Sequence, residues 1–295
     1  MKIDAVFSGG GVKAYAFLGA IKVLEEKGYS FNRVAGTSAG AVMAGFIAAG
    51  YRVDEIIDVF EEIDLEKFLD EPWIGKYLPF LKWLKLYFSL GLYKGEFIEQ
   101  WLYEKFAQKN VYTFSDLPED RLKVVASDLT MGRIVVFPDD LERFYGINPA
   151  NFPVSRAIRM SVSIPYFFKP GKIKNYLHGK SILVDGGLLS NFPVWVFDNE
   201  KNVKTRPLLG MQLSEKIGRL PASNIKNAID MVHAIVTTMR KAHDARYISK
   251  KDAADIMFLP VKNVDATNFS LDKESKNKLI DLGKKQAIDF LKKWP

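Results

Sequence analysis

Five small residues, Gly36-Thr37-Ser38-Ala39-Gly40, separate an apolar run from a segment with helical periodicity. The run from Phe31 to Ala35 predicts a short strand, and Thr37 to Ala49 predicts a helix whose small residues permit close packing. A Gly-x-Ser-x-Gly sequence between a strand and a helix forms a sharp turn that exposes the serine and tolerates only small neighbours. The chain must therefore fold around a strand, turn and helix unit, with Ser38 as the candidate nucleophile.

A second unit of the same kind begins the chain. Ile3 to Phe7 predicts a strand, Val12 to Lys27 predicts a helix, and Gly9-Gly10-Gly11 lies between them. Backbone N–H groups of Gly10 and Gly11, at the positive end of a helix, are suited to stabilise a developing negative charge. The sequence therefore predicts an oxyanion hole in this glycine loop.

The rest of the chain alternates between the two kinds of element. Further strands are predicted at Leu122 to Ala126, Arg133 to Phe137, Ser181 to Val184 and Leu208 to Leu213, and helices at Asp54 to Leu69, Ser223 to Tyr247 and Lys273 to Lys292. Alternating strands and helices predict a central, mostly parallel sheet with helices on both faces. We therefore expect an α/β fold of three layers, α/β/α.

The composition favours one globular domain over residues 1–295. Of the 295 residues, 48% are hydrophobic, which is enough to bury a large core, and we find no internal repeat or low-complexity linker. The absence of cysteine excludes disulfides, thiolate metal sites and a cysteine nucleophile. The uncharged stretch from Val34 to Tyr51 contains four glycines and few large side chains, which favours a buried strand and helix over a membrane span.

The first residues and the charge distribution indicate a compartment and a class of partner. The chain runs from Met1 into glycines without room for a signal peptide, so we expect a cytoplasmic protein. A net charge of +7 favours anionic partners such as a phospholipid surface. Because the basic residues are spread among acidic ones, without a dense basic run carrying interleaved aromatics, we expect no nucleic acid to bind.

The segment from Pro72 to Trp101 differs from the rest of the chain in composition. It contains nine aromatic residues, and its lysines interrupt the apolar run, so it is poorly suited to span a bilayer. Such a segment can lie at a membrane interface or cover a lipid-binding cleft, and a helical layer packed on the core explains it equally well. We expect a helical, aromatic-rich insertion or lid-like segment over residues 54–110.

A serine nucleophile needs a base, and two arrangements are open. Asp185-Gly186-Gly187 places a carboxylate at the end of an apolar strand, with glycines that let another backbone segment approach. Histidine is the usual base, and the chain has His178, His233 and His243. The order Ser38, Asp185, then a late histidine would match an α/β-hydrolase triad. Both late histidines lie in a predicted long helix rather than on a loop, which favours Asp185 itself as the base.

Two other classes of protein remain as alternatives. Gly9-x-Gly11-x-x-Ala14 after a first strand also fits a dinucleotide-binding fingerprint, which has an acidic residue about twenty positions on to bind a ribose hydroxyl. No acidic residue occupies that neighbourhood, so only an NADP-binding version that uses Arg33 would fit, and it leaves the Ser38 turn unexplained. A non-catalytic lipid-binding module would depend on the aromatic segment instead of Ser38.

Three motifs, in this order, resemble those of the patatin-like phospholipases. The family's oxyanion motif corresponds to Gly9-Gly10-Gly11-Val12-Lys13, its serine turn to Gly36-Thr37-Ser38-Ala39-Gly40, and its aspartate to Asp185 in Asp185-Gly186-Gly187. The segment from Ala157 to Pro165 is similar to the family's serine and proline segment near the cleft. Lys13 stands where the family often has arginine, so it keeps the charge but loses the bidentate fork.

The resemblance implies a bacterial-type member with a patatin-like fold and a lipid acyl hydrolase activity of the phospholipase A or lysophospholipase type. It implies that Ser38 and Asp185 form a catalytic dyad without histidine, that Gly9 to Gly11 form the oxyanion hole, and that Lys13 contacts substrate or phosphate. We expect no cofactor and no metal, since the sequence has no metal-ligand cluster or calcium-loop pattern. The expected partners are a phospholipid or other lipid ester and, peripherally, an anionic membrane surface.

Overall fold

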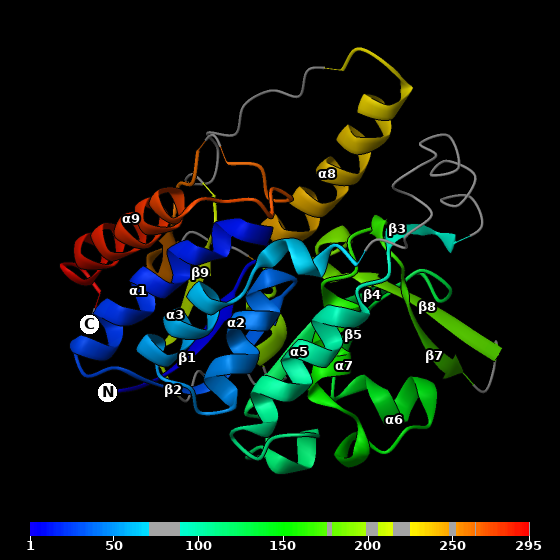
Figure 1. Cartoon of the computed structure of the whole chain (residues 1–295), viewed down its shortest axis with the longest axis horizontal. Helices are drawn as coiled ribbons and strands as arrows, with labels where there is room; N and C mark the ends of the chain where they lie inside the picture. Colours follow the sequence, from blue (N-terminus) through cyan, green and yellow to red (C-terminus); the bar gives the residue numbers. More distant parts are fainter. Residues whose placement is uncertain are drawn as a thin grey trace.

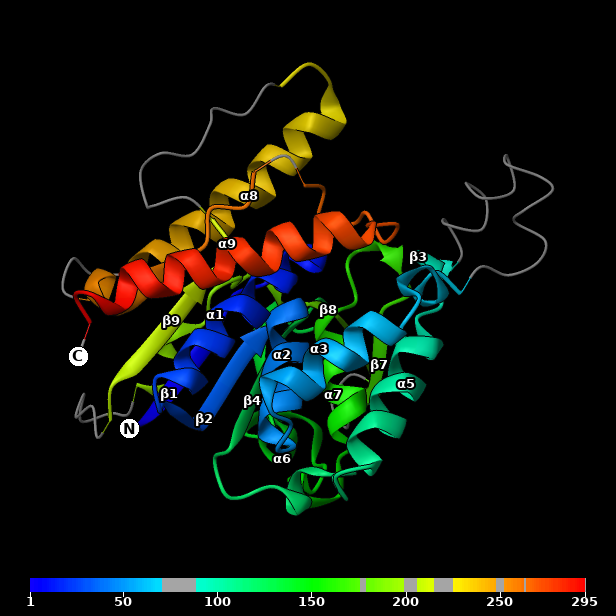
Figure 2. The same cartoon turned by 60° about the vertical axis from the view of Figure 1, so that its left-hand side comes forward.

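The computed structural model describes residues 1–70, 89–175, 179–198, 206–214, 225–247, 252–262 and 264–294. Most of the aromatic-rich segment from Pro72 to Trp101 therefore lies outside the described residues. The predicted fold class is confirmed, because a central, mostly parallel sheet is flanked by helices (Figure 1, Figure 2). No helix in the described part of the chain is both long and apolar enough to cross a membrane.

The main sheet contains eight strands from the described residues. They are β1 Lys2–Phe7, β2 Ser30–Thr37, β4 Leu122–Asp128, β5 Arg133–Phe137, β7 Gly171–Asn175, β8 Gly179–Asp185, β9 Leu208–Gln212 and β10 Ile256–Phe258. Their order is β10-β9-β1-β2-β4-β8-β7, with β5 also paired to β4, and the first five strands of this order are mutually parallel. The antiparallel pairs join β4 to β5, β4 to β8 and β7 to β8. A second, small sheet pairs β3 (Gly91–Tyr93) with β6 (Tyr166–Phe168).

The α-helices that the structure describes are α1 Tyr15–Glu26, α2 Ala39–Ala48, α3 Val53–Glu62, α5 Glu96–Ala107, α6 Asp140–Tyr145, α7 Val154–Ser161, α8 Ala228–Tyr247 and α9 Lys273–Leu291. In both views α1, α2, α3 and α9 lie together on one side of the sheet. There α1 packs along α9, and α2 packs on β1, β2 and β4. In the same views α8 projects from the body of the molecule.

The strand β1 shows how the core is divided between the two faces of the sheet. Ile3, Ala5 and Phe7 join the large cluster that includes the buried side chains of α1 and α2, whereas Val6 joins a smaller cluster with Phe192. This alternation follows the two-residue period of a strand, which turns successive side chains to opposite faces. All five residues from Ile3 to Phe7 are buried, as expected for a strand that is covered on both faces.

The helix predicted from Asp54 to Leu69 is wrong in its extent. In the structure α3 ends at Glu62, and a separate 3-10 helix, η2, covers Leu65–Phe68. The break occurs because Ile63 and Asp64 are extended, and the Asp64 carboxylate accepts a hydrogen bond from the first turn of η2. The sequence signal for the break was therefore an N-cap aspartate inside an otherwise helical pattern.

The strand β4 brings two of the predicted site residues together. It pairs with β2 from Leu122 to Val125 and then with β8 from Ala126 to Asp128, so it extends two residues past the strand end predicted at Ala126. Thr37 is opposite Val125, and Asp185 is opposite Ala126. The ends of β2 and β8 therefore meet beside consecutive residues of β4. As a result Ser38 and Asp185, 147 positions apart in the sequence, are neighbours.

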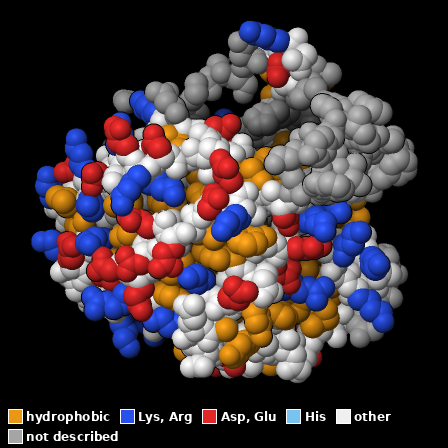
Figure 3. Space-filling view, viewed as in Figure 1, with side chains coloured by type: hydrophobic (Ala, Val, Ile, Leu, Met, Phe, Trp, Pro, Cys, Tyr) orange, Lys and Arg blue, Asp and Glu red, His pale blue; other side chains and the backbone are white. Residues whose placement is uncertain are grey.

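The molecular surface carries charges of both signs. On the face drawn in Figure 3, Lys and Arg side chains are interspersed with Asp and Glu, and hydrophobic side chains are exposed between them. On this face the basic side chains are thus mixed with acidic ones rather than gathered into one block.

Candidate active site

Ser38 lies between β2 and α2 in a backbone conformation that few residues with side chains adopt. Its φ is 55° and its ψ is −128°, so the turn is strained. A Cβ on Gly36 would lie 2.2 Å from the carbonyl oxygen of Gly40, and a Cβ on Gly40 would lie 2.4 Å from that of Phe7. The prediction of a sharp strand-to-helix turn that demands small neighbours is confirmed by this geometry.

The backbone of the turn is held by α7. The Ser38 N–H donates to the Ser161 hydroxyl at 2.9 Å, and that hydroxyl donates to the carbonyl of Val125 at 2.6 Å. On the other side of the turn, the Thr37 hydroxyl donates to the carbonyl of Ser190 at 3.1 Å. Sequence reasoning noticed Ser161 only as part of a segment that resembles the family's motif, and it assigned Ser161 no role.

The Ser38 hydroxyl donates a hydrogen bond to Oδ2 of Asp185 at 2.5 Å. Oδ1 of the same carboxylate accepts from the Gly187 N–H at 2.7 Å, within the 3-10 turn η6 (Gly186–Leu188) that follows β8. The Asp185 N–H donates to the carbonyl of Ser163 at 2.8 Å. Both carboxylate oxygens therefore have fixed partners, and the side chain is oriented as a base in contact with a nucleophile would be.

Burial raises the pKa of Asp185 from its ordinary value of 3.8 to about 6. Only 6% of its surface is exposed, and the loss of hydration outweighs the opposing hydrogen bonds from Ser38 and Gly187 and the positive charge of Arg240. A carboxylate with this pKa is still ionised at neutral pH, and it is a stronger base than an exposed aspartate.

The glycine loop between β1 and the 3-10 turn η1 (Gly11–Ala14) offers two backbone donors. The N–H of Gly9 donates to the carbonyl of Asn191 at 2.9 Å, so it is already engaged within the protein. Among the described residues, the N–H groups of Gly10 and Gly11 have no hydrogen-bond partner. The candidate oxyanion donors are therefore Gly10 and Gly11, while Gly9 ties the loop to the segment that follows Asp185.

The segment before α9 covers the glycine loop. Gly11 has a φ of +55°, and a Cβ there would lie 2.0 Å from the carbonyl oxygen of Ala266, which also accepts from the Val12 N–H at 3.0 Å. Lys13 is half-buried on η1, and hydrogen bonds from Thr267 together with the charge of Lys13 hold the pKa of Asp265 below its ordinary value. Lys13 is thus at the edge of the loop, and sequence reasoning did not foresee the Ala266 segment beside it.

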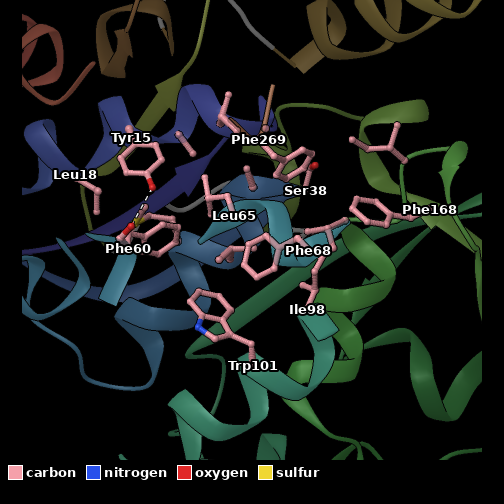
Figure 4. A pocket seen from close by; sticks show the side chains of 18 residues that line it. Tyr15, Leu18, Ser38, Phe60, Leu65, Phe68, Ile98, Trp101, Phe168 and Phe269 are labelled. Carbon is pink, nitrogen blue, oxygen red and sulfur yellow. Dashed lines mark hydrogen bonds between the residues drawn. The ribbon is translucent and has the colours of Figure 1, made fainter. Parts of the chain in front are cut away.

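An apolar pocket is lined in part by Ser38. Figure 4 shows side chains that point into it from α1, α3, η2, α5 and the segment before α9, and those labelled besides Ser38 are Tyr15, Leu18, Phe60, Leu65, Phe68, Ile98, Trp101, Phe168 and Phe269. The Tyr15 hydroxyl donates to the carbonyl of Phe60 at 3.1 Å, so it is satisfied within the wall. Walls of this kind suit an acyl chain, and the Ser38 hydroxyl is the polar group that such a chain's ester would meet.

Comparison with known proteins identifies the family of this chain. A protein-family model described as patatin-like phospholipase matches residues 5–198, a range that includes the glycine loop, Ser38 and Asp185. The chain belongs to the patatin-like phospholipase family. The resemblance inferred from the three motifs is confirmed, and membership in this family supports lipid acyl hydrolase activity in general.

A curated relative and two solved structures are similar to this chain over nearly its whole length. The uncharacterized protein YqhO of Bacillus subtilis (strain 168) is 50% identical over 294 residues, which are 100% of this chain and 99% of that protein. VipD from Legionella pneumophila has a TM-score of 0.58 at 17% identity, over 98% of this chain and 66% of that one. ExoU in its complex with SpcU from Pseudomonas aeruginosa has a TM-score of 0.52 at 17% identity, over 99% of this chain and 51% of that one. The chain thus spans about half to two thirds of these structures, and the likeness to them concerns the fold alone.

No described hydrogen bond of Ser38 or Asp185 involves a histidine. His243 is on α8, where its Nδ1 lies 3.7 Å from Oδ1 of Asp244 and its ring packs against Trp195. The side chain of His233 and the whole of His178 lie outside the described residues. The described part of this patatin-like site therefore contains a serine and an aspartate in contact, and no histidine beside them.

Two charged residues that sequence reasoning missed hold loops around the patatin-like site. Arg159 on α7 is buried, and it donates to the carbonyl of Gly95 and to the Ser163 hydroxyl, each at 2.6 Å. Asp244 on α8 accepts from the Ser190 hydroxyl and from the Asn191 N–H, each at 3.2 Å. Arg159 belongs to the segment from Ala157 to Pro165, so a signal was present there, but nothing in the sequence around Asp244 indicates its role.

The dinucleotide alternative finds no support in the geometry. Arg33, on which an NADP site would depend, forms an ion pair with Asp4 at 2.6 Å, and its guanidinium carbon lies 4.6 Å from the centre of the Phe197 ring. The carbonyl of Ala266 already accepts from the Val12 N–H, one of the donors at the helix start where a pyrophosphate would bind.

The described part of the chain offers no candidate metal site, because no three of its His, Asp or Glu side chains gather in a way that could hold a metal ion. Independence from metal nevertheless stays a prediction.

Proposed function

We propose that the chain is a serine hydrolase of lipid esters, of the phospholipase A or lysophospholipase type, with Ser38 as nucleophile and Asp185 as base. The observation that carries the proposal is the 2.5 Å hydrogen bond from the Ser38 hydroxyl to Asp185. This bond occurs at a strained turn, beside the glycine loop and at the wall of an apolar pocket. Each of these features has its own part in ester hydrolysis.

In the proposed reaction, Oδ2 of Asp185 accepts the hydroxyl proton while Oγ of Ser38 attacks the carbonyl carbon of the ester. The carbonyl oxygen becomes an oxyanion, which the N–H groups of Gly10 and Gly11 stabilise. The tetrahedral intermediate then expels the alcohol, which takes the proton from Asp185, and an acyl-serine remains. Water attacks this acyl-serine with Asp185 again as base, and the fatty acid leaves as Ser38 regains its proton.

The burial of Asp185 supports its part as base. A general base works best when its pKa is near the pH of the reaction, and burial brings the pKa of Asp185 from 3.8 to about 6. The proton transfer still has a weak driving force at neutral pH, so the oxyanion hole must supply much of the rate. One oxyanion donor typically stabilises the transition state by about 2.7–4 kcal/mol, so the N–H groups of Gly10 and Gly11 can supply a large part of the rate.

The apolar pocket supports a fatty acyl chain as the acid part of the ester. Phe68 and Trp101, which face this pocket, belong to the insertion predicted over residues 54–110. We propose that the described part of this insertion forms a wall of the acyl site. We further propose that Lys13, at the edge of the glycine loop, contacts the phosphate of a phospholipid substrate.

Hydrolysis of a soluble, short-chain chromogenic ester tests the assignment. Ser38→Ala and Asp185→Asn proteins should each lose about a thousandfold or more in kcat, because each lacks one half of the proposed dyad. His243→Gln is the matched control, and it should keep the turnover of the wild type. Unchanged activity in Ser38→Ala protein would refute the hydrolase, and loss of activity in His243→Gln protein would favour the triad.

A panel of lipids, analysed by mass spectrometry with wild-type and Ser38→Ala protein, tests the substrate class. The proposal expects fatty acid release from phospholipids or lysophospholipids with the wild type alone. Vesicle binding by the wild type without turnover of any ester would favour the non-catalytic lipid-binding module instead.

A further inference from the structure

A second pocket adjoins the loop that follows Asp185. It lies between α8, the start of β5 and the residues after η6, and we name it the α8 pocket. The residues of the α8 pocket used below are Arg133, Leu188, Leu189, Met239, Arg240 and Arg246. The described residues that line the α8 pocket and those that line the pocket at Ser38 do not overlap, so the two are separate sites.

Three arginines line the α8 pocket. Arg133, Arg240 and Arg246 form no ion pair with any residue that the structure describes. Nε of Arg133 is buried and lacks a hydrogen-bond partner among them, and its guanidinium lies 3.4 Å from the centre of the Phe144 ring. Arg240 donates to the carbonyl of Gly187 at a long 3.4 Å, and Arg246 is exposed. The three guanidinium groups thus have few hydrogen-bond partners among the described residues.

The carboxylates near the α8 pocket are directed to other partners. Asp244 on α8 accepts from the Ser190 hydroxyl and the Asn191 N–H. Asp185 is buried and accepts from Ser38 and Gly187. Asp140, which is close enough to Arg133 for the arginine's charge to favour its ionised form, accepts from the Val136 N–H at 2.7 Å. None of these three carboxylates forms an ion pair with an arginine of the α8 pocket, so the guanidinium groups keep donors for a ligand.

The α8 pocket also has apolar walls that continue onto an exposed face of the helix. Leu188 and Leu189 form one wall, and Met239, 62% exposed, stands at the pocket on α8. Ile235 and Met231 precede Met239 at intervals of four residues and are each 51% exposed, so the three side chains follow one face of α8. An exposed apolar stripe beside cations is typical of a surface that meets lipid.

We propose that the α8 pocket binds the phosphate group of an anionic phospholipid. Arginine is suited to phosphate because its planar guanidinium presents paired donors to the phosphate oxygens. A soluble phosphate would use the arginines but leave the apolar walls in contact with water, whereas a lipid covers both. The site is distinct from the ester site, and it does not require that Ser38 be catalytic.

Isothermal titration of Ser38→Ala protein, which cannot turn over the ligand through Ser38, tests the proposal. The titrants are dihexanoyl-phosphatidylglycerol below its critical micelle concentration and inorganic phosphate. We expect the lipid to bind more tightly than phosphate. In this background, Arg133→Gln and Arg246→Gln should each weaken lipid binding about tenfold, because each removes charge-assisted hydrogen bonds to the phosphate. Lys241→Gln is the matched control on α8, since it loses the same charge outside the pocket, and it should bind like its parent.

Flotation with phosphatidylcholine vesicles, with and without phosphatidylglycerol, extends the test to a membrane. We expect binding only to the vesicles that contain phosphatidylglycerol, and reduced binding by Arg133→Gln and Arg246→Gln. Equal binding by these variants and by Lys241→Gln would place the lipid elsewhere and overturn the proposal. Inorganic phosphate binding as tightly as the lipid would overturn the lipid assignment.

The failure of this proposal can be distinguished from failure of the proposed hydrolase. Arg133→Gln and Arg246→Gln, in a chain that retains Ser38, should hydrolyse the soluble chromogenic ester at the wild-type rate, which also shows that they fold. Arg246 is exposed, so its substitution carries little risk to the fold even if Arg133→Gln proves unstable.

Discussion

Replacing Asp185 by asparagine should make the protein more stable at neutral pH, although it removes the proposed base. Burial raises the pKa of this carboxyl from 3.8 to about 6, a rise that corresponds to about 3 kcal/mol because one pH unit is worth about 1.4 kcal/mol. A carboxyl with a higher pKa in the folded chain than in the unfolded chain holds its proton more tightly when folded. The stability that comes from this tighter proton binding is therefore fully present below the unfolded pKa of 3.8. It is lost as the pH rises through the folded pKa of about 6, above which the buried carboxylate is charged and destabilises the fold.

Asparagine retains the shape of the side chain and its contacts. Its Oδ1 can accept from the Gly187 N–H, and its amide can donate to the Ser38 hydroxyl oxygen, in place of the bonds at 2.7 and 2.5 Å. The figure of about 3 kcal/mol is an upper limit, because the carboxylate's charge-assisted hydrogen bonds are stronger than those of an amide. We expect the Asp185→Asn protein to gain about 1–3 kcal/mol in free energy of unfolding at pH 8.

Urea unfolding, followed by circular dichroism at pH 8 and again near pH 4, measures this gain. The midpoint for Asp185→Asn should exceed that of the wild type at pH 8, and the difference should nearly vanish near pH 4. Asp116→Asn is a control of opposite sign, because hydrogen bonds from Thr113 and Tyr112 lower the pKa of Asp116, so its ionised form stabilises the fold at pH 8. The reasoning is refuted if Asp185→Asn is no more stable than the wild type at pH 8, or if it gains equally at both pH values.

Three further predictions concern activity. The kcat/KM for the soluble ester should fall about tenfold for each pH unit below about 6, where Asp185 becomes protonated. In Arg240→Gln protein, the pH at which this fall begins should be higher, because the positive charge that lowers the pKa of Asp185 is lost. Ser161→Ala leaves the Ser38 N–H without its acceptor, so steady-state kinetics should show kcat lowered about tenfold or more, with KM little changed. An unchanged kcat would mean that the turn holds its geometry without Ser161. Phe68→Leu enlarges the apolar pocket, so a series of chromogenic esters should show the optimum moving to longer acyl chains, and an unmoved optimum would place the chain elsewhere.

The parts of the molecule that sequence alone could predict depend on neighbouring residues. Apolar periodicity and glycine placement define β1, α1, β2 and α2, because both signals act within a few residues. The turn at Ser38 is predictable for the same reason, since Gly36 must leave room for Gly40 four positions away. Short elements such as α7, with eight residues, fall below the length at which periodicity distinguishes a helix from a strand, and α7 was missed.

The contacts that complete the candidate site are long-range, and local patterns do not encode them. Ser38 is 147 positions from Asp185 and 123 from Ser161, and they meet because β8 enters antiparallel beside β4 where β2 ends. Periodicity says which face of a strand is buried but not which strand lies beside it. The Ala266 carbonyl over the glycine loop is a further case, because the backbone of any residue could have supplied it.

A dyad without histidine makes two opposed demands on one carboxylate. To act as a base near neutral pH, Asp185 needs a pKa well above that of an exposed aspartate, and burial supplies this by removing the water that would stabilise its charge. The same burial would protonate it if nothing opposed the effect. The hydrogen bonds from Ser38 and Gly187 and the charge of Arg240 act in the opposite direction, and they keep the pKa at about 6. The proposed base is therefore ionised yet poorly hydrated at pH 7, a state that costs stability and that an aspartate needs if it is to replace histidine.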